Sequence, residues 1–412
     1  MGDEEILISG AGPAGVATSL FLSQLKIRHT IIDKASFPRD KVCGDALSGK
    51  VVHVLNKIDP TIVPQLSAYP NDFTGSYGIC FYAPNGKKLD IPFSTNPDML
   101  KNAPGFIARR INFDNFLFNK LDKKFATVEA STTLVDLIRE DKKIVATLQN
   151  SKGIFQKKFN LIIGADGERS IVAKKLDPHK KKLSSYCAAL RAYYSGITDT
   201  NEKKYIELHF IKELLPGYFW IFPMNDGTAN VGIGMLSEVV AEKKINLRKK
   251  MEEIIAAHPS IKERFKNARL EGTIQGWGLP LGSAKRSLAG DNFILTGDAG
   301  SLIDPFTGEG IGNALYSGML AAETIAKAVQ EKKFNKEFLL EYETKLYKNL
   351  SDELRLSHGI QKLAKFSWLF NFVVKKASKN KILQETITCM FDDLDIRSRL
   401  RKPSFYFKLI FN

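Results

Sequence analysis

Cysteine and long apolar runs are the two features that this sequence of 412 residues has least of. The four cysteines lie far apart, with no CxxC or other metal-ligand spacing, at Cys43, Cys80, Cys187 and Cys389. Such spacing argues against a disulfide framework and indicates a reducing compartment. No stretch of 18 uncharged apolar residues occurs, so no segment is expected to span a membrane. The amino terminus, MGDEE, is acidic where a signal peptide needs positive charge, and we therefore expect a cytoplasmic protein.

Histidine is scarce, and acidic residues are fewer than basic ones. The six histidines show no metal-ligand spacing, so no metal site is predicted. Lysine and arginine number 60 against 45 aspartates and glutamates, which gives a net charge of +15. This excess favours an anionic partner such as a phospholipid surface or a phosphorylated substrate, although a solvated lysine-rich surface has the same composition. No nucleic-acid-binding motif accompanies the charge, and no nucleic-acid partner is expected.

A dinucleotide-binding motif opens the chain. The short apolar run at residues 6–8 precedes a Gly-x-Gly-x-x-Gly turn and a helix-like stretch to about Leu25, and a second apolar run ends in an aspartate. The glycines allow a tight turn and a close approach to a pyrophosphate at a helix N-terminus, and the aspartate can accept ribose hydroxyls. The residues expected to hold the dinucleotide here are Gly10, Gly12, Ala14, Gly15 and Asp33. An acid at position 33 favours FAD or NAD over NADP.

Two later segments repeat this strand-then-glycine pattern. Residues 134–164 alternate as a three-stranded β-meander, beginning at Leu134 and leading into a buried strand that ends before Asp166 and Gly167. Near residue 295 another apolar strand ends in Gly297-Asp298, followed by a loop rich in proline and glycine and by a helix that begins near Gly310.

These three motifs, in this order, resemble the FAD-dependent oxidoreductases built on the p-hydroxybenzoate hydroxylase fold. The resemblance implies that Asp298 binds a ribityl hydroxyl and that the N–H groups of Gly310 and Ile311 meet the flavin N1/O2 edge. A helix N-terminus at that edge would stabilise the negative charge of a reduced flavin. We therefore expect FAD as the cofactor.

Within that superfamily, the chain is most similar to the geranylgeranyl reductase group. The shared motifs are Lys41-Val42-Cys43-Gly44-Asp45, Arg110-x-x-Phe113-Asp114, and Pro216 to Pro223 with Asn230-Val231-Gly232. The resemblance implies that Cys43 and Gly44 line the flavin and that Arg110 contacts the cofactor pyrophosphate. Cys43 could equally be a small buried residue that fills space beside the ring.

An aromatic strand supplies the candidate substrate face. Tyr218, Trp220 and Phe222 alternate, so their side chains share one face of a strand. With Cys43, Tyr218 and Trp220 are the candidate catalytic residues, although an aromatic stripe is also typical of plain core. The turn Asn225-Asp226-Gly227 predicts a hairpin, and "YAPNGKKLDIPF" a second hairpin in the same sheet.

The expected fold is α/β (α+β): a Rossmann-type FAD-binding domain with a β-meander, a mostly antiparallel substrate sheet and a helical C-terminal region. We expect the FAD-binding domain at residues 1–70, 100–185 and 285–330, the substrate-binding domain at 71–99 and 186–284, and the helical region at 331–412. Segments such as "FSWLFNFVVKKASKNK" and "IRSRLRKPSFYFKLIFN" place lysine or arginine beside bulky apolar residues. They fit a peripheral contact at the inner membrane face, or a helix packed on the domain.

The resemblance implies reduction of C=C bonds of a polyprenyl lipid by hydride transfer from flavin N5. The proton source is left open between Cys43, a tyrosine and water. The alternative is a monooxygenase or halogenase that activates O2 on an aromatic substrate. Halogenases of this superfamily show W-x-W-x-I-P where this chain has Y-x-W-x-F-P at residues 218–223. A flavin-dependent binding or sensing protein is a third hypothesis. Only one dinucleotide motif occurs, so the electron donor stays open between NAD(P)H and a small redox protein.

Overall fold

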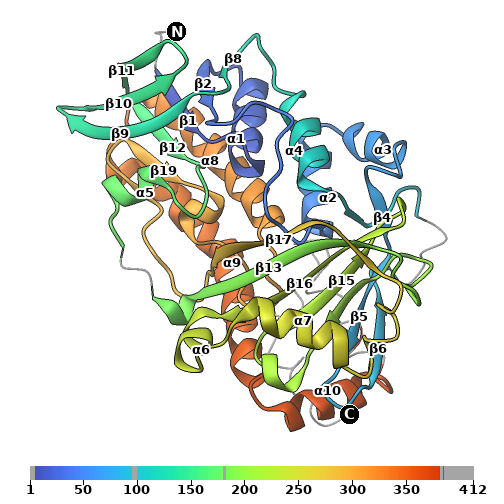
Figure 1. The fold of residues 1–412 in the computed structure, drawn as a ribbon. Helices are drawn as coiled ribbons and strands as arrows, with labels where there is room; N and C mark the ends of the chain where they lie inside the picture. Colours follow the sequence, from blue (N-terminus) through green and yellow to red (C-terminus); the bar gives the residue numbers. More distant parts are fainter. Residues whose placement is uncertain (1–4, 95–99, 180–181, 381–383, 385–412) are drawn as a thin grey trace.

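A mostly parallel sheet forms the centre of one of the two halves of the molecule. The computed structural model describes residues 5–94, 100–179, 182–380 and 384 (Figure 1). Within these residues six strands run in the order β18-β19-β12-β1-β2-β8, all parallel except β18. Their bounds are β1 Ile6–Ser9, β2 His29–Ile32, β8 Ala126–Glu129, β12 Leu161–Gly164, β18 Ala289–Gly290 and β19 Phe293–Leu295. Strands β1 and β12 are buried along their whole length, as expected for short apolar runs in a parallel sheet.

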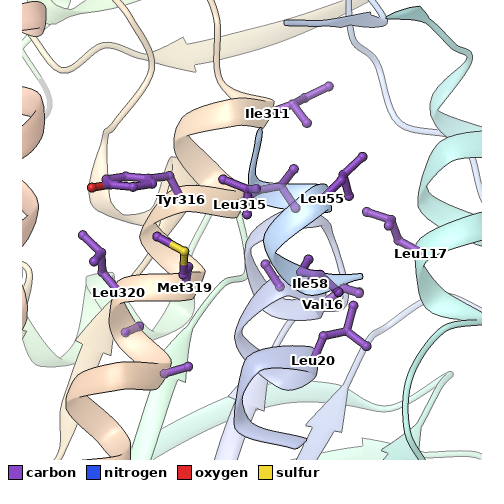
Figure 2. Close-up of a cluster of buried hydrophobic side chains, with 14 of the residues drawn as sticks. Val16, Leu20, Leu55, Ile58, Leu117, Ile311, Leu315, Tyr316, Met319 and Leu320 are labelled. Atoms are coloured by element: carbon purple, nitrogen blue, oxygen red, sulfur yellow. The ribbon is translucent and has the colours of Figure 1, made fainter. Parts of the chain in front are cut away.

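Two helices with many small residues pack on this sheet. Helix α1 (Pro13–Gln24) begins at the glycine turn, and α8 (Ile311–Glu331) lies along it. A β-carbon on Gly318 would stand 2.5 Å from the carbonyl oxygen of Ala14, so the two backbones approach closely. Figure 2 shows the core here, where α1, α2 (Gly49–Ile58), α4 (Arg110–Phe118) and α8 bring together Val16, Leu20, Leu55, Ile58, Leu117, Ile311, Leu315, Tyr316, Met319 and Leu320.

Two further sheets are small and antiparallel. The predicted meander is present as β9 (Thr133–Glu140), β10 (Lys143–Asn150) and β11 (Gly153–Phe159), in the order β11-β10-β9. The other sheet joins β3 (Ala46–Leu47), β7 (Gly105–Ile107) and β4 (Thr74–Ser76). Short helices α3 (Ile62–Ser67) and α5 (Ile171–Leu176) complete this half.

The second half of the molecule is a mostly antiparallel sheet, as predicted. Its order is β17-β13-β16-β15-β14-β5-β6, and β5 runs parallel to β14. The bounds are β5 Gly78–Tyr82, β6 Lys88–Pro92, β13 Tyr186–Ser195, β14 Ile206–His209, β15 Tyr218–Pro223, β16 Thr228–Leu236 and β17 Arg269–Pro280. Both predicted hairpins, β5–β6 and β15–β16, belong to it. Helices α6 (Ser237–Glu242) and α7 (Leu247–Ala257) lie on this half (Figure 1).

Helices α9 (Lys336–Leu363) and α10 (Ser367–Ala377) follow the last elements of the parallel-sheet half, as the sequence predicts for residues 331–380. Helix α9 packs on α8 and β18, and α10 contacts β6 of the second sheet (Figure 1). None of the helices in the described ranges is long and apolar enough to cross a membrane. The predicted fold class is confirmed. The second basic segment, residues 396–412, lies outside the described residues, and the three-part domain division stays a prediction.

Candidate functional site

A cavity of about 640 Å³ lies between the parallel sheet and the antiparallel sheet. Almost every site residue predicted from sequence lines it: Gly10, Gly12, Ala14, Asp33, Cys43, Gly44, Arg110, Leu134, Asp166, Gly167, Tyr218, Trp220, Asp298, Gly310 and Ile311. Gly15 does not, because it packs behind the turn against the backbone of Gly10. Residues more than 280 positions apart in the chain therefore form one site.

The glycine turn shapes one end of the cavity. Gly10 has a φ of 101°, and a β-carbon there would stand 2.4 Å from the carbonyl oxygen of Ala165. At Gly12, in contrast, a β-carbon would meet within 4 Å only the Arg39 guanidinium, at 3.7 Å. Gly12 thus presents open space at the N-terminus of α1, which is the cradle that a pyrophosphate needs.

Asp33 stands directly after β2 at the same end. Its two carboxylate oxygens accept the backbone N–H groups of Ala11 and Ala35, each at 2.9 Å. These bonds hold the carboxylate beside the glycine turn, where it can accept ribose hydroxyls. The Arg39 guanidinium lies 3.8 Å from Asp33 and donates to Asp114 at 2.7 Å.

Arg110 forms a buried ion pair within α4. Its Nε and Nη2 both donate to the Asp114 carboxylate, each at 2.6 Å, and Arg110 also interacts with Cys43. Burial opposes the charge on Asp114, but Arg110 and then Arg39 hold its pKa below the usual range. The guanidinium is therefore fixed at the cavity wall next to the thiol.

Asp166 is half-buried at the end of β12. One carboxylate oxygen accepts the N–H of Ile171 at 2.8 Å, whereas the other has no hydrogen-bond partner among the described residues. Burial raises the pKa of Asp166, although Ser170 and backbone N–H groups oppose the rise. A buried carboxylate oxygen without a donor is costly, and a bound hydroxyl group would satisfy it.

Asp298 and the N-terminus of α8 line the cavity next to each other. Lys41 Nζ donates to the Asp298 carboxylate at 3.2 Å. This bond joins the loop of residues 41–45, called the cysteine loop below, to the end of the parallel sheet. Gly310 caps α8, and a β-carbon there would stand 3.6 Å from Asp298 Oδ1. The free N–H groups of the helix thus lie beside the carboxylate, as the resemblance implies for a flavin site.

The predicted aromatic face is present on β15. Tyr218, Trp220 and Phe222 all line the cavity, whereas Phe219 and Ile221 pack into the core on the other side of the sheet. A β-carbon on Gly44 would stand 3.2 Å from the Phe222 ring, so the loop lies flat against this face. The Tyr218 hydroxyl donates to the carbonyl oxygen of Thr307, and burial raises its pKa.

Asp45 lines the site but was not predicted from the sequence as a site residue, although it ends the motif Lys41-Val42-Cys43-Gly44-Asp45. Asp45 is fully buried and lines the cavity. Its Oδ2 accepts the Tyr193 hydroxyl at 2.6 Å and the Asn230 amide at 2.8 Å, and Asn230 also binds the Cys43 carbonyl. Burial raises the pKa of Asp45 to about 6. Its signal in the sequence was its place at the end of that motif.

Comparison with known proteins agrees with this geometry. The family model described as FAD binding domain matches residues 3–348. The chain belongs to this family. It is an FAD-dependent oxidoreductase, with FAD as its cofactor.

Among the relatives of this flavoprotein, a digeranylgeranylglycerophospholipid reductase from Thermoplasma volcanium is 27% identical over 88% of each chain. A menaquinone reductase from Mycobacterium tuberculosis is 28% identical, over 78% of this chain and 76% of its own. A geranylgeranyl bacteriochlorophyll reductase-like protein from Thermoplasma acidophilum has the same fold, with a TM-score of 0.79, 22% identity and coverage of 96% and 98%. A flavin-dependent brominase shares the fold at a TM-score of 0.76, with 20% identity and 94% coverage of each chain.

The residues present fit FAD. The open cradle at Gly12, the fixed Asp33 carboxylate and the unpartnered oxygen of Asp166 each suit a different polar part of a dinucleotide. When bound in its reduced form, FAD supplies a hydride to an acceptor placed beside it.

Proposed function

We propose that the protein reduces C=C bonds in the isoprenoid chain of a lipid. The observation that carries the proposal is the division of the cavity into two unlike halves. One half gathers the nucleotide-binding groups, and the other is apolar, lined by Phe93, Phe106, Ile206, Leu208, Trp220 and Phe222. An apolar wall facing a hydride donor suits an unfunctionalised alkene chain. The names of the relatives, a geranylgeranylated phospholipid reductase and a menaquinone reductase, support the same substrate class.

Particular side chains carry the site in this proposal. Gly10, Gly12, Ala14, Asp33, Leu134, Asp166 and Gly167 hold the nucleotide part of FAD, with Gly15 supporting the turn. Lys41 positions Asp298 for the ribityl chain, and the N–H groups of Gly310 and Ile311 face the flavin. Cys43 and Gly44 line the flavin ring, Arg110 contacts the pyrophosphate, and Tyr218 and Trp220 form the substrate wall. The apolar wall also excludes water, which protects a reduced intermediate from side reactions.

An anaerobic experiment tests this function. The bound flavin is reduced chemically and mixed with a geranylgeranylated glycerophospholipid or with a menaquinone, while oxidised flavin absorbance and product mass are followed. We expect reoxidation with a gain of two hydrogens per turnover for at least one of the two lipids. The lipid that reacts identifies the source of the isoprenoid chain. If the flavin stays reduced with both lipids and with a free polyprenol, the proposed function is wrong.

Oxygen activation is the competing function, because the brominase has the same fold. The lysines that line the cavity within the described residues are Lys34 and Lys41, both among the nucleotide-binding groups. The apolar half therefore offers no lysine of the kind that a halogenase uses. If the reduced enzyme stays unreactive until oxygen is admitted and then gives a C4a-adduct spectrum, this second function replaces the first.

We infer that the flavin receives its electrons from a donor that is not part of this chain. A single dinucleotide motif occurs, and FAD occupies it in our assignment. The donor is then NAD(P)H that binds transiently, or a small redox protein. Stopped-flow reduction of the oxidised enzyme by NADH or NADPH separates these alternatives.

We further propose that α10 rests on a lipid surface. Five large apolar side chains on or beside α10 remain exposed, and Trp368 is the most exposed of them at 68%. The five are Leu363, Phe366, Trp368, Phe372 and Val373. Lys375 and Lys376 lie in its last turn. The opposite side is anchored, because Phe370 packs on Phe210 at a ring-centroid distance of 4.3 Å and Asn371 accepts the N–H of Asn85 at 3.2 Å. Apolar and basic side chains on one exposed helix suit an anionic bilayer.

A further inference from the structure

Glu309 directly precedes the residue that caps the N-terminus of α8. Its backbone N–H donates to Thr307 Oγ1 at 3.2 Å, and its carbonyl oxygen accepts the Asp304 N–H at 2.9 Å. These bonds close the loop on itself. Gly308, with a φ of 72°, brings the same loop to the aromatic face, because a β-carbon there would stand 3.0 Å from the Tyr218 hydroxyl oxygen. In the chain, Glu309 therefore lies between the residue that meets the aromatic face and the helix end at which we place the flavin.

The Glu309 carboxylate lies against the first turn of α8. Its Oε1 accepts the hydroxyl of Ser48, the N-cap residue of α2. A β-carbon on Gly312, within that first turn, would overlap with the same oxygen. Glu309 is half-buried, and both Glu309 and Ser48 line the cavity. The carboxylate is thus fixed beside the positive end of a helix, in the wall of the site.

Charged groups from several elements surround this end of α8. Lys50 is fully buried on α2, and its Nζ donates to Glu353 on α9 at 2.9 Å. Lys41 donates to Asp298 at 3.2 Å. Asp304 is buried in the loop before α8, where burial and then the Glu353 charge raise its pKa. Together with Glu309, the charged groups are Lys41, Lys50, Asp298, Asp304 and Glu353. Each lysine already has a carboxylate partner, so Glu309 adds negative charge to the N-terminal end of α8.

We propose that the Glu309 carboxylate lowers the reduction potential of the bound flavin. The inference rests on the proposed placement of the flavin at the N-terminus of α8, and not on which acceptor is reduced. Reduction by two electrons and one proton leaves one negative charge near flavin N1. The helix N-terminus stabilises this charge, and a carboxylate against the same turn opposes it. The reduced flavin is then a stronger hydride donor, as an alkene without activating groups requires. Glu309 acts through the flavin and is a tuning residue, not a proton donor.

A structural tie is the competing role for Glu309. The bond from Ser48 joins the loop before α8 to the start of α2, so its loss would loosen the site even if the charge had no effect. Two substitutions separate these roles. Glu309→Gln removes the charge but keeps an oxygen that accepts the Ser48 hydroxyl. Ser48→Ala removes the bond but keeps the charge.

Glu309→Gln is the deciding variant, and the flavin reduction potential is the measurement. Each holoenzyme is equilibrated anaerobically with a redox dye of known potential. We expect the variant to prefer the reduced flavin at least about tenfold more than the wild type does, which raises the potential by roughly 30 mV. Glu323→Gln is the matched control, because Glu323 is exposed on the same helix, about 12 residues or roughly 18 Å beyond Ile311. Its potential should stay that of the wild type. An unchanged or lower potential in Glu309→Gln, or an equal rise in Glu323→Gln, overturns the proposal.

The pH dependence of the potential separates charge from structure. A protonated Glu309 is neutral like glutamine, so the difference in potential between the wild type and Glu309→Gln should be largest at high pH. It should shrink as pH falls and Glu309 takes up a proton. Ser48→Ala should keep a potential closer to that of the wild type than to that of Glu309→Gln. A difference that does not vary with pH, or an equal rise in Ser48→Ala, makes Glu309 a structural tie and overturns the proposal.

These measurements need no lipid, so they are independent of the proposed reaction. An unchanged potential in Glu309→Gln, with a wild type that a lipid reoxidises, overturns this inference alone. A raised potential in Glu309→Gln, with a wild type that no lipid reoxidises, supports the role of Glu309 and overturns the proposed function.

Discussion

A β-carbon on Gly15 would stand 1.8 Å from the carbonyl oxygen of Gly10. Gly10 and Gly15 therefore have a different role from Gly12, which lies between them in the sequence. Gly10 and Gly15 let the start of α1 close onto the end of β1, whereas Gly12 keeps the cavity open above the turn. Replacement by alanine should separate a packing role from a cofactor role.

Gly15→Ala should lower the free energy of unfolding by about 1–3 kcal/mol or more, because the added carbon meets rigid backbone. Gly12→Ala should leave the unfolding midpoint of the apoprotein nearly unchanged, since only a flexible guanidinium lies within 4 Å, yet weaken FAD binding. Urea titrations of the apoproteins and flavin fluorescence titrations measure the two effects. Equal loss of stability in both variants would contradict this division.

Asp298→Ala should purify largely without yellow colour. In the proposed assignment a ribityl hydroxyl donates one hydrogen bond to the charged Asp298 carboxylate, and its loss weakens FAD binding by about tenfold to a hundredfold. Asp136→Ala, at an exposed ion pair with Lys175, is the matched control and should keep its flavin. The ratio of flavin to protein absorbance measures occupancy. Full occupancy of the Asp298→Ala variant by FAD would show that Asp298 does not bind the cofactor.

Cys43→Ala should keep FAD and reoxidise with lipid at a rate within about tenfold of the wild type. We expect this because the thiol interacts with the buried Arg110 guanidinium, and in the proposed assignment it lines the flavin and tunes it without supplying the proton. The flavin reduction potential, measured by equilibration with a redox dye, should shift. A loss of 100-fold or more in the reoxidation rate would instead make Cys43 the acid, and an unchanged potential and rate would make it a packing residue.

Trp368→Ala combined with Phe372→Ala should reduce binding to vesicles that contain anionic phospholipid. The two rings are exposed, so the melting temperature should stay within a few degrees of the wild type. Ile154→Ala removes an equally exposed apolar side chain from β11 and serves as the control. Co-sedimentation at low and high salt measures binding, and salt should weaken it because the lysines contribute. Undiminished sedimentation of the double variant would place any lipid contact elsewhere.

Much of the nucleotide half was predictable because its determinants are local. A buried strand, a glycine turn and a helix follow one another within 25 residues, and each residue type has its own conformational reason to be there. The alternation of Tyr218, Trp220 and Phe222 likewise predicts a shared face, which the cavity confirms. Gly15 was predicted to bind the cofactor from the motif as a whole, whereas its closest contact is the turn itself.

Asp45 illustrates what a local pattern leaves open. Five residues of sequence identify the cysteine motif, but an aspartate in such a loop is ordinarily a solvated turn residue. Its burial depends on Tyr193 and Asn230, which are 148 and 185 positions away. Strand periodicity therefore predicts the nucleotide site and the aromatic face, because backbone geometry repeats over a few residues. The acid acquires its environment when distant strands pack over the loop, because desolvation is a property of the assembled core.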